Sequence, residues 1–129
     1  MTRFLIIDRD DFSRERIVTT LSPIFRQFEC MFDGFKSFND IVSTNGNKFN
    51  IAILSADVCI KARLNIQEFK KLFGAPECKI IITSAMVSEL PSELSDADLF
   101  IKKDDLWDLR LKRKVELAEK ILVLCPVAH

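Results

Sequence analysis

The run Phe4-Leu5-Ile6-Ile7 constrains the fold of this chain more than any other stretch. Consecutive apolar residues of this number are too few for an independent helix, but they suit a strand buried on both faces of a parallel sheet. The run ends abruptly in the charged segment Asp8-Arg9-Asp10-Asp11. In open α/β sheets the functional site lies just beyond the carboxyl ends of the strands, so we expect this segment at that edge.

Similar apolar runs recur along the chain and alternate with segments of helical spacing. Each run is short and bounded by turn residues or charge, which favours strands, and the segments between them carry apolar residues three or four apart. Pro91 interrupts one of these segments and leaves only a short, weak helix there. The expected strands are 4–7, 28–32, 51–54, 78–82 and 99–101, and the expected helices are 12–21, 35–42, 64–73, a short one within 87–95, and 106–124.

This alternation predicts an α/β fold. Strands that alternate with helices form parallel sheets, and right-handed crossovers place helices on both faces. The 129 residues fit one compact domain, spanning 1–129, with no repeats or linkers. We therefore expect a doubly wound, five-stranded parallel sheet of the flavodoxin-like (βα)5 type.

Composition excludes several classes of function. Lys and Arg number 19, as do Asp and Glu, so no global field attracts nucleic acid or acidic lipid. The cysteines lack metal-ligand spacing, and we expect reduced packing residues rather than a zinc or disulfide framework. His129 is the one histidine, which argues against Ser-His and Cys-His nucleophile pairs. The cysteines are Cys30, Cys59, Cys78 and Cys125.

No apolar run approaches the length needed to cross a bilayer, and the N-terminal run is too short for a signal peptide. We therefore expect a cytoplasmic protein that does not contact a membrane. The charged residues after the first strand, with only three glycines in the chain, also argue against a glycine-lined phosphate loop of a flavodoxin-like cofactor binder.

The strand ends carry a resemblance that covers nearly the whole chain. The stretches F-L-I-I-D-R-D-D-F-S-R-E, F-N-I-A-I-L-S, I-I-I-T-S and D-A-D-L-F-I-K-K-D resemble the ends of the first, third, fourth and fifth strands of response-regulator receiver domains. Those domains are the phosphate-accepting modules of two-component signalling and are commonest in bacteria. The resemblance implies the receiver fold and a place in bacterial signal transduction.

The resemblance assigns a family position to each residue of the expected pocket. Asp8 stands at the first acidic position and Arg9 at the second, which is acidic in the family; Asp10 is a further acidic candidate. Ser55 stands where the phospho-accepting Asp is found. The conserved hydroxyl, the aromatic switch position, the conserved Lys and the position of the usual Pro correspond to Thr83, Phe100, Lys103 and Asp104.

Two departures break the phosphotransfer chemistry. An Asp carboxylate must attack phosphorus, and a magnesium ion held by several oxygens must offset the charge of the transferring group. Ser55 offers a neutral hydroxyl with no neighbouring base, which makes it a poor nucleophile. Arg9 is always charged and only donates hydrogen bonds, so it would repel magnesium. We therefore expect no catalytic residues, no cofactor, and loss of magnesium binding.

The replacement of an acidic residue by Arg9 has two interpretations. In the first, Arg9 takes the place of the metal ion and locks the pocket in one state, because Asp8 and Asp10 facing Lys103 and Arg9 leave it near neutral. In the second, the site has drifted once phosphorylation was lost, and Arg9 points to solvent.

Other residues near the pocket also leave alternatives. Asp57 is an alternative acceptor, but alternation along an extended segment, or displacement in a loop, moves it several ångströms from Lys103. Asp10 with a displaced metal site is a second alternative. Asp10 and Asp11 also suit a helix N-cap, and this role favours Asp11. Thr83 suits a satisfied polar group at the end of a buried strand.

A surface remains if the chemistry is lost. In receivers the fourth helix, fifth strand and fifth helix form the face that dimerises or binds partners, here residues 87–95, 99–101 and 106–124. Trp107 on that face suits either an anchor for a partner or a cover of the core edge. The sequence therefore predicts an atypical, phosphorylation-independent receiver that acts as a protein-interaction module, not an enzyme. The alternative is a working phospho-acceptor that uses Asp57 or Asp10.

Overall fold

A five-stranded sheet forms the centre of the protein. The structure, a computed structural model, describes residues 2–31, 49–85, 90–107 and 110–124. The strands pair in the order β2-β1-β3-β4-β5, and every pairing is parallel. This confirms the predicted doubly wound α/β fold. The strands are β1 (Arg3–Ile7), β2 (Gln27–Met31), β3 (Phe49–Ser55), β4 (Gly74–Ser84) and β5 (Leu99–Lys102).

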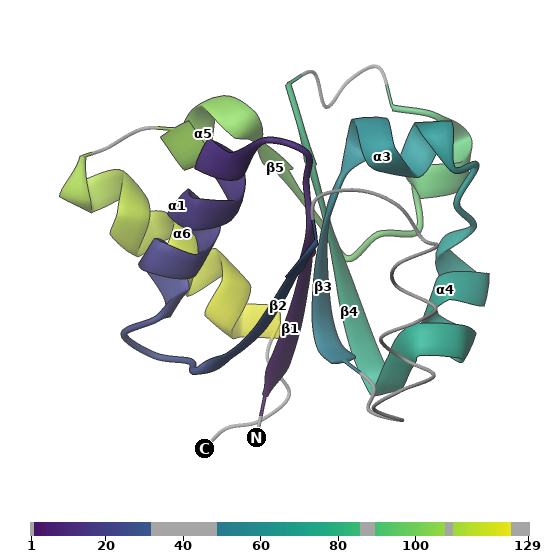
Figure 1. Ribbon diagram of the computed structural model, residues 1–129, viewed down its shortest axis with the longest axis horizontal. Coiled ribbons are helices and arrows are strands. Elements are labelled where there is room, and N and C mark those ends of the chain that lie inside the picture. The colour runs from purple at the N-terminus through teal and green to yellow at the C-terminus, as the bar shows by residue number, and fades with distance from the viewer. Residues whose placement is uncertain (1, 32–48, 86–89, 108–109, 125–129) are drawn as a thin grey trace.

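Helices cover both faces of this sheet (Figure 1). α1, α5 and α6 lie on one face, and α3 and α4 lie on the other. This two-sided cover explains why the central strands are apolar at successive positions, since both sides of each strand are buried. The helical elements are α1 (Asp11–Leu21), α3 (Ala56–Lys61), α4 (Ile66–Phe73), the 3-10 turn η2 (Ser92–Leu94), α5 (Lys103–Trp107) and α6 (Leu111–Leu124).

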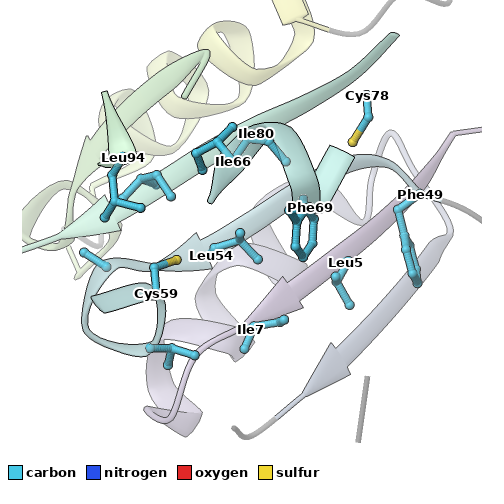
Figure 2. Packing of buried hydrophobic residues seen from close by; sticks show 14 residues of the cluster. Leu5, Ile7, Phe49, Leu54, Cys59, Ile66, Phe69, Cys78, Ile80 and Leu94 are labelled. Atoms are coloured by element: carbon cyan, nitrogen blue, oxygen red, sulfur yellow. The ribbon is translucent and has the colours of Figure 1, made fainter. Parts of the chain in front are cut away.

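Each face of the sheet has its own hydrophobic core. On one face, Leu5 and Ile7 of β1 pack in a cluster with Phe69 of α4 and with Cys59 and Leu94, as Figure 2 shows. On the other, strand residues of the alternate register pack with residues of α1, α5 and α6. The strand residues include Phe4, Ile6 and Ile53, and the helix residues include Ile17, Leu117 and Ile121. The alternation of side chains along each strand thus divides one apolar run between two cores.

The register of the strands brings their carboxyl ends level with one another. Ile7 pairs with Leu54, and the next residue of β3, Ser55, pairs with Thr83 of β4. Ser84 pairs with Lys102 at the end of β5. Asp98 fixes this last pairing, because its carboxylate accepts a hydrogen bond from the Ile80 amide at 2.7 Å and its own amide donates to the Ile80 carbonyl at 2.8 Å.

Most of the predicted elements are observed within the described residues, but some bounds were wrong and one helix was missed. α3 was not expected, because its six residues are too few to display a helical period. The expected helix 64–73 is observed as α4. The expected helix 106–124 is divided into α5 and α6. The spacing of apolar residues did not reveal this division, because Leu106 of α5 and Leu117 of α6 pack in the same cluster. Within 90–95 the chain forms only the short turn η2, as Pro91 suggested.

Some predictions cannot be compared with the structure. The helix expected over 35–42, and both Cys125 and His129, lie outside the described residues. Cys59 and Cys78 are buried free thiols, as expected for packing residues, and burial raises the pKa of each, to about 12 for Cys59 and about 11 for Cys78. No helix in the described ranges is long and apolar enough to span a bilayer.

Neighbouring positions of α6 provide a test of the second core. Ile121 is 1 % exposed, and Val123 is 82 % exposed. We expect Ile121→Ala to lower the free energy of unfolding by about 2–5 kcal/mol, because it removes buried methyl groups and leaves a cavity. Val123→Ala should change it by no more than about 0.5 kcal/mol. Urea denaturation followed by circular dichroism measures both, and equal losses would contradict the assigned orientation of α6.

Candidate functional site

A buried carboxylate lies at the carboxyl edge of the sheet. Asp8 directly follows β1, and its side chain is only 2 % exposed. Its Oδ1 accepts a hydrogen bond from the Asp10 amide at 2.9 Å. Burial raises the pKa of Asp8, and this effect exceeds the opposing effects of the Asp10 amide and of the positive charge of Lys103.

Lys103 provides the cation of this site. It is the first residue of α5, directly after β5, and its side chain is 13 % exposed. Its Nζ lies 3.5 Å from Asp8 Oδ1 and 3.4 Å from Oδ2. The contact with Oδ2 is an ion pair without hydrogen-bond geometry, since that oxygen has no hydrogen-bond partner among the described residues. Lys103 therefore offsets the charge of Asp8 inside the pocket.

Asp57 lies close to Lys103, contrary to expectation. Its Oδ1 is 4.0 Å from Lys103 Nζ and also accepts a hydrogen bond from the buried hydroxyl of Ser55. The prediction of a separation of several ångströms assumed an extended segment. Instead α3 begins directly after Ser55, and its first turn brings Asp57 back over the edge.

The charge state of Asp57 differs from that of Asp8. Partial burial acts to raise the pKa of Asp57, but the Ser55 hydrogen bond and the charge of Lys103 together lower it. The Asp57 side chain is 63 % exposed, so water solvates much of its charge. Lys103 thus faces two different carboxylates. Asp8 is buried and resists ionisation, whereas Asp57 is exposed and ionises more readily.

Thr83 contributes an unused hydroxyl. It pairs with Ser55 across the β3–β4 ladder and is 1 % exposed. Its Oγ1 has no hydrogen-bond partner among the residues that the structure describes. The expectation of a satisfied polar group is therefore wrong within the described residues. A buried hydroxyl without a partner is unfavourable, so a group that could bond to Thr83 would stabilise this edge.

Asp10 is the N-cap of α1, a role that the sequence favoured for Asp11. Its Oδ1 accepts from the Phe12 amide at 3.1 Å, and its Oδ2 accepts from the Ser13 hydroxyl at 2.7 Å. The Ser13 hydrogen bond lowers the pKa of Asp10. Asp11 instead lies in the first turn, where a carboxylate also interacts favourably with the helix dipole. Both oxygens of Asp10 are consequently engaged with α1.

Arg9 is exposed to solvent, whereas Arg14 contacts the main chain of Asp8. Arg9 is exposed, and the charged groups that act on Asp8 are Lys103 and Asp57, not Arg9. The interpretation in which Arg9 replaces the metal ion is thus wrong, and its alternative, a solvent-facing Arg9, holds. Arg14 of α1, which was not among the expected pocket residues, donates to the Asp8 carbonyl and pairs with Asp11. A basic residue one turn after an N-cap is the signal that could have revealed this contact.

The expected switch face includes Phe100 and Trp107. Phe100 is half-buried in β5 and packs against the same core as Leu5 and Ile7. Trp107 is the last residue of α5, and its side chain lies outside the described residues. The geometry at the edge therefore unites Asp8, Ser55, Asp57, Thr83 and Lys103, with Asp10 beside them and Arg9 turned away.

The solved structures to which this chain is similar include receiver domains. The protein superposes on the signal receiver domain of an HD domain-containing protein from Pseudomonas fluorescens Pf-5 with a TM-score of 0.69 and 15 % identity, over 96 % of this chain and 86 % of that one. The response regulator TrrA from Thermotoga maritima, solved in complex with Mg2+-BeF, gives a TM-score of 0.64 and 20 % identity, over 96 % and 99 %. An orphan response regulator of H. pylori gives 0.63 and 14 %, over 96 % of each chain.

No family model and no curated protein matches the sequence. The likeness at these identities concerns the fold. It establishes that this chain has the receiver architecture over nearly its whole length.

The opposite pKa shifts at the edge predict opposite effects of two similar substitutions. The pKa of Asp8 is raised above its ordinary value of 3.8, so its contribution to stability falls as the pH rises from 3.8 through the folded-state pKa. The pKa of Asp57 is lowered, so its contribution is present above 3.8 and is lost as the pH falls through the folded-state pKa. At pH 7, Asp8→Asn should therefore stabilise the protein and Asp57→Asn should destabilise it.

Urea denaturation at pH 7 and at an acid pH below both folded-state pKa values checks this prediction. At acid pH the free energy of unfolding of each variant should differ less from that of the native chain, because the native carboxyl groups are then neutral as well. Destabilisation by Asp8→Asn at pH 7 would show that the ion pair with Lys103 outweighs the burial of Asp8.

Proposed function

We propose that this protein is an atypical receiver domain that acts in bacterial signal transduction as a phosphorylation-independent protein-interaction module in the cytoplasm, without enzymatic activity. One observation carries the proposal. The carboxylates at the sheet edge are already engaged by the protein: Asp8 pairs with Lys103, and both oxygens of Asp10 bond to α1. An edge in this state does not need a metal or a phosphoryl group to be electrostatically balanced.

The donor set does not fit magnesium. This ion requires near-octahedral oxygen coordination and is usually held by carboxylates. Freeing the Asp10 carboxylate would remove the cap of α1, and the adjacent Arg9 offers only donors. Among the described residues, no group of three His, Cys, Asp or Glu is placed to hold a metal ion. We therefore infer that the protein functions without magnesium or another cofactor.

The residue at the acceptor position does not suit phosphoryl transfer. Ser55 is fully buried, and its hydroxyl donates to Asp57. A serine becomes an effective nucleophile when a neighbouring base takes its proton. Asp57 is a weak base for this purpose, because the hydrogen bond and Lys103 lower its pKa. Ser55 therefore serves to orient Asp57 rather than to accept a phosphoryl group.

A working phospho-acceptor at Asp57 is the second candidate. The observation in its favour is geometric: the exposed Asp57 carboxylate lies 4.0 Å from Lys103. The unpartnered hydroxyl of Thr83 belongs to the same sheet edge, since Thr83 pairs with Ser55. In this version an Asp57 carboxylate oxygen would attack the phosphorus atom of a phosphodonor such as acetyl phosphate. The bond from phosphorus to the donor's leaving group would break and release acetate, and Lys103 would stabilise the charge on the transferring group. The missing metal ligands weigh against it, since the transferring group carries several negative charges.

The interaction surface that we propose includes β5 and α6. On α6, Val115 is 47 % exposed and Leu122 is 38 % exposed. Residues seven apart lie on the same side of a helix, so these two side chains form one apolar stripe. α6 also carries exposed acidic and basic residues, including the Arg113–Glu116 pair, where Nη1 and Oε2 are 3.2 Å apart. This surface suits a protein partner or a second copy of this chain, and neither a nucleic acid nor a membrane.

Phosphodonor treatment tests the absence of phosphorylation. Intact mass is measured after incubation with magnesium and acetyl phosphate. We expect no phosphate on the native chain, because the metal ligands are engaged or replaced. The double variant Arg9→Asp with Ser55→Asp, which has the family residues at both positions, is the positive control and should gain one phosphate.

One result of this experiment would reverse the proposal. A single phosphate on the native chain that disappears in Asp57→Asn would identify a displaced catalytic centre, and the protein would be a phosphorylation switch. A phosphate that persists in Asp57→Asn but disappears in Asp10→Asn would assign the same role to Asp10.

Substitution on α6 tests the interaction surface. If the partner is a second copy, sedimentation equilibrium should show a dimer that Val115→Glu weakens at least tenfold, because a buried unpaired carboxylate is unfavourable. Ile24→Glu is the matched control, since Ile24 is 47 % exposed in the loop after α1. A monomer at all concentrations would exclude the second copy as the partner, and equal weakening by both variants would exclude this stripe as the interface.

A further inference from the structure

A pocket lies at the C-terminal end of α3 and is not used by the proposed function. Its volume is about 310 Å³, and it lies between the end of α3 and the turn η2. Cys59, Leu64 and Leu94 form part of its apolar lining. Figure 2 shows Cys59 and Leu94 at the same end of the core cluster. Pockets that bind small molecules are concave and mostly apolar, with a few polar groups, and this volume is at the small end of their range.

Two charged residues complete the lining. Arg63 and Glu93 both line the pocket, and both are exposed. Neither forms an ion pair or a side-chain hydrogen bond within the described part of the chain. The N–H donors of the Arg63 guanidinium are thus available to a ligand. The planar guanidinium can donate two parallel hydrogen bonds to a carboxylate. Glu93 adds a negative charge to the same pocket and disfavours a ligand with a second acidic group.

The backbone at Arg63 is unusual for an arginine. α3 ends in a Schellman motif, in which the Arg63 amide donates to the Ile60 carbonyl at 3.1 Å and the Leu64 amide donates to the Cys59 carbonyl at 3.0 Å. Arg63 occupies the left-handed position of this motif with φ 52°. Glycine is the residue most favoured at this position, because a side chain there is sterically unfavourable. Arg63 therefore stands at a position that the local backbone does not favour for an arginine.

We propose that this pocket binds a small monocarboxylic acid with an apolar body. The ligand's carboxylate pairs with Arg63, and its body packs against Cys59, Leu64 and Leu94. The neutral, buried thiol of Cys59 acts as part of the apolar wall. This site is separate from the sheet edge, so the proposal does not depend on whether the protein accepts a phosphoryl group.

Titration with simple acids and their neutral counterparts tests the site. The probes are butanoate, hexanoate and phenylacetate, each paired with the corresponding amide, and binding is followed by 1H–15N spectra of the full chain. We expect shifts of the amide signals of Cys59, Arg63, Leu64 and Leu94, with at least one acid binding at least tenfold more tightly than its amide. Absence of these shifts with all three acids, or equal affinity of acid and amide, would overturn the proposal.

The Schellman motif supplies a variant that separates binding from folding. Arg63→Gly should raise the melting temperature, because glycine suits φ 52°, and should abolish the tenfold preference for the acid. Lys61→Gln is the matched control, since it removes an exposed positive charge from the same helix outside the pocket, and it should bind like the native chain. Ile60→Trp, a change of a half-exposed lining residue, should block both acid and amide. Unchanged acid binding in Arg63→Gly would overturn the assignment of the carboxylate to Arg63.

Discussion

The parallel register of β1, β3 and β4 is the constraint on which the rest of the structure depends. Because helices cover both faces, successive residues of these strands are buried, and polar groups are tolerated only where the strands end. The register brings those ends level, so Asp8, Ser55 and Thr83 emerge at one edge. A carboxylate buried there requires a positive partner, and Lys103 meets this requirement from the end of β5, three strands along the sheet from β1.

The sequence predicted the edge well because apolar runs mark where strands end. Asp8, Ser55, Thr83 and Lys103 each follow or close such a run, and parallel pairing then brings them together without any further information. Side-chain direction beyond the strand ends was predicted poorly. Asp57 depends on where α3 begins, and a helix of six residues leaves no periodic signal. Arg14, and not Arg9, contacts Asp8, and this choice depends on the geometry of the N-cap at Asp10.

The two carboxylates that share Lys103 are not equivalent. Asp8 is held at 2 % exposure by the core beneath it, so its contact with Lys103 persists as long as the sheet does. Asp57 is 63 % exposed and is attached through Ser55 and the first turn of α3. Salt and water screen the exposed contact far more than the buried one. Asp57 is consequently the adjustable member of the site, and Asp8 with Lys103 is the fixed part.

Helix α3 connects this adjustable member to the apolar pocket. Asp57 lies in its first turn and Arg63 directly follows its C-cap, so a helix of six residues, roughly 9 Å long, separates the two charges. Val58 and Cys59 of the same helix are buried in the core cluster. Because close-packed cores resist gradual deformation, α3 is expected to shift as a unit or not at all. A ligand that fixed the Arg63 end would therefore also restrict the position of Asp57 relative to Lys103, which gives this chain a physical route by which its edge could respond without phosphorylation.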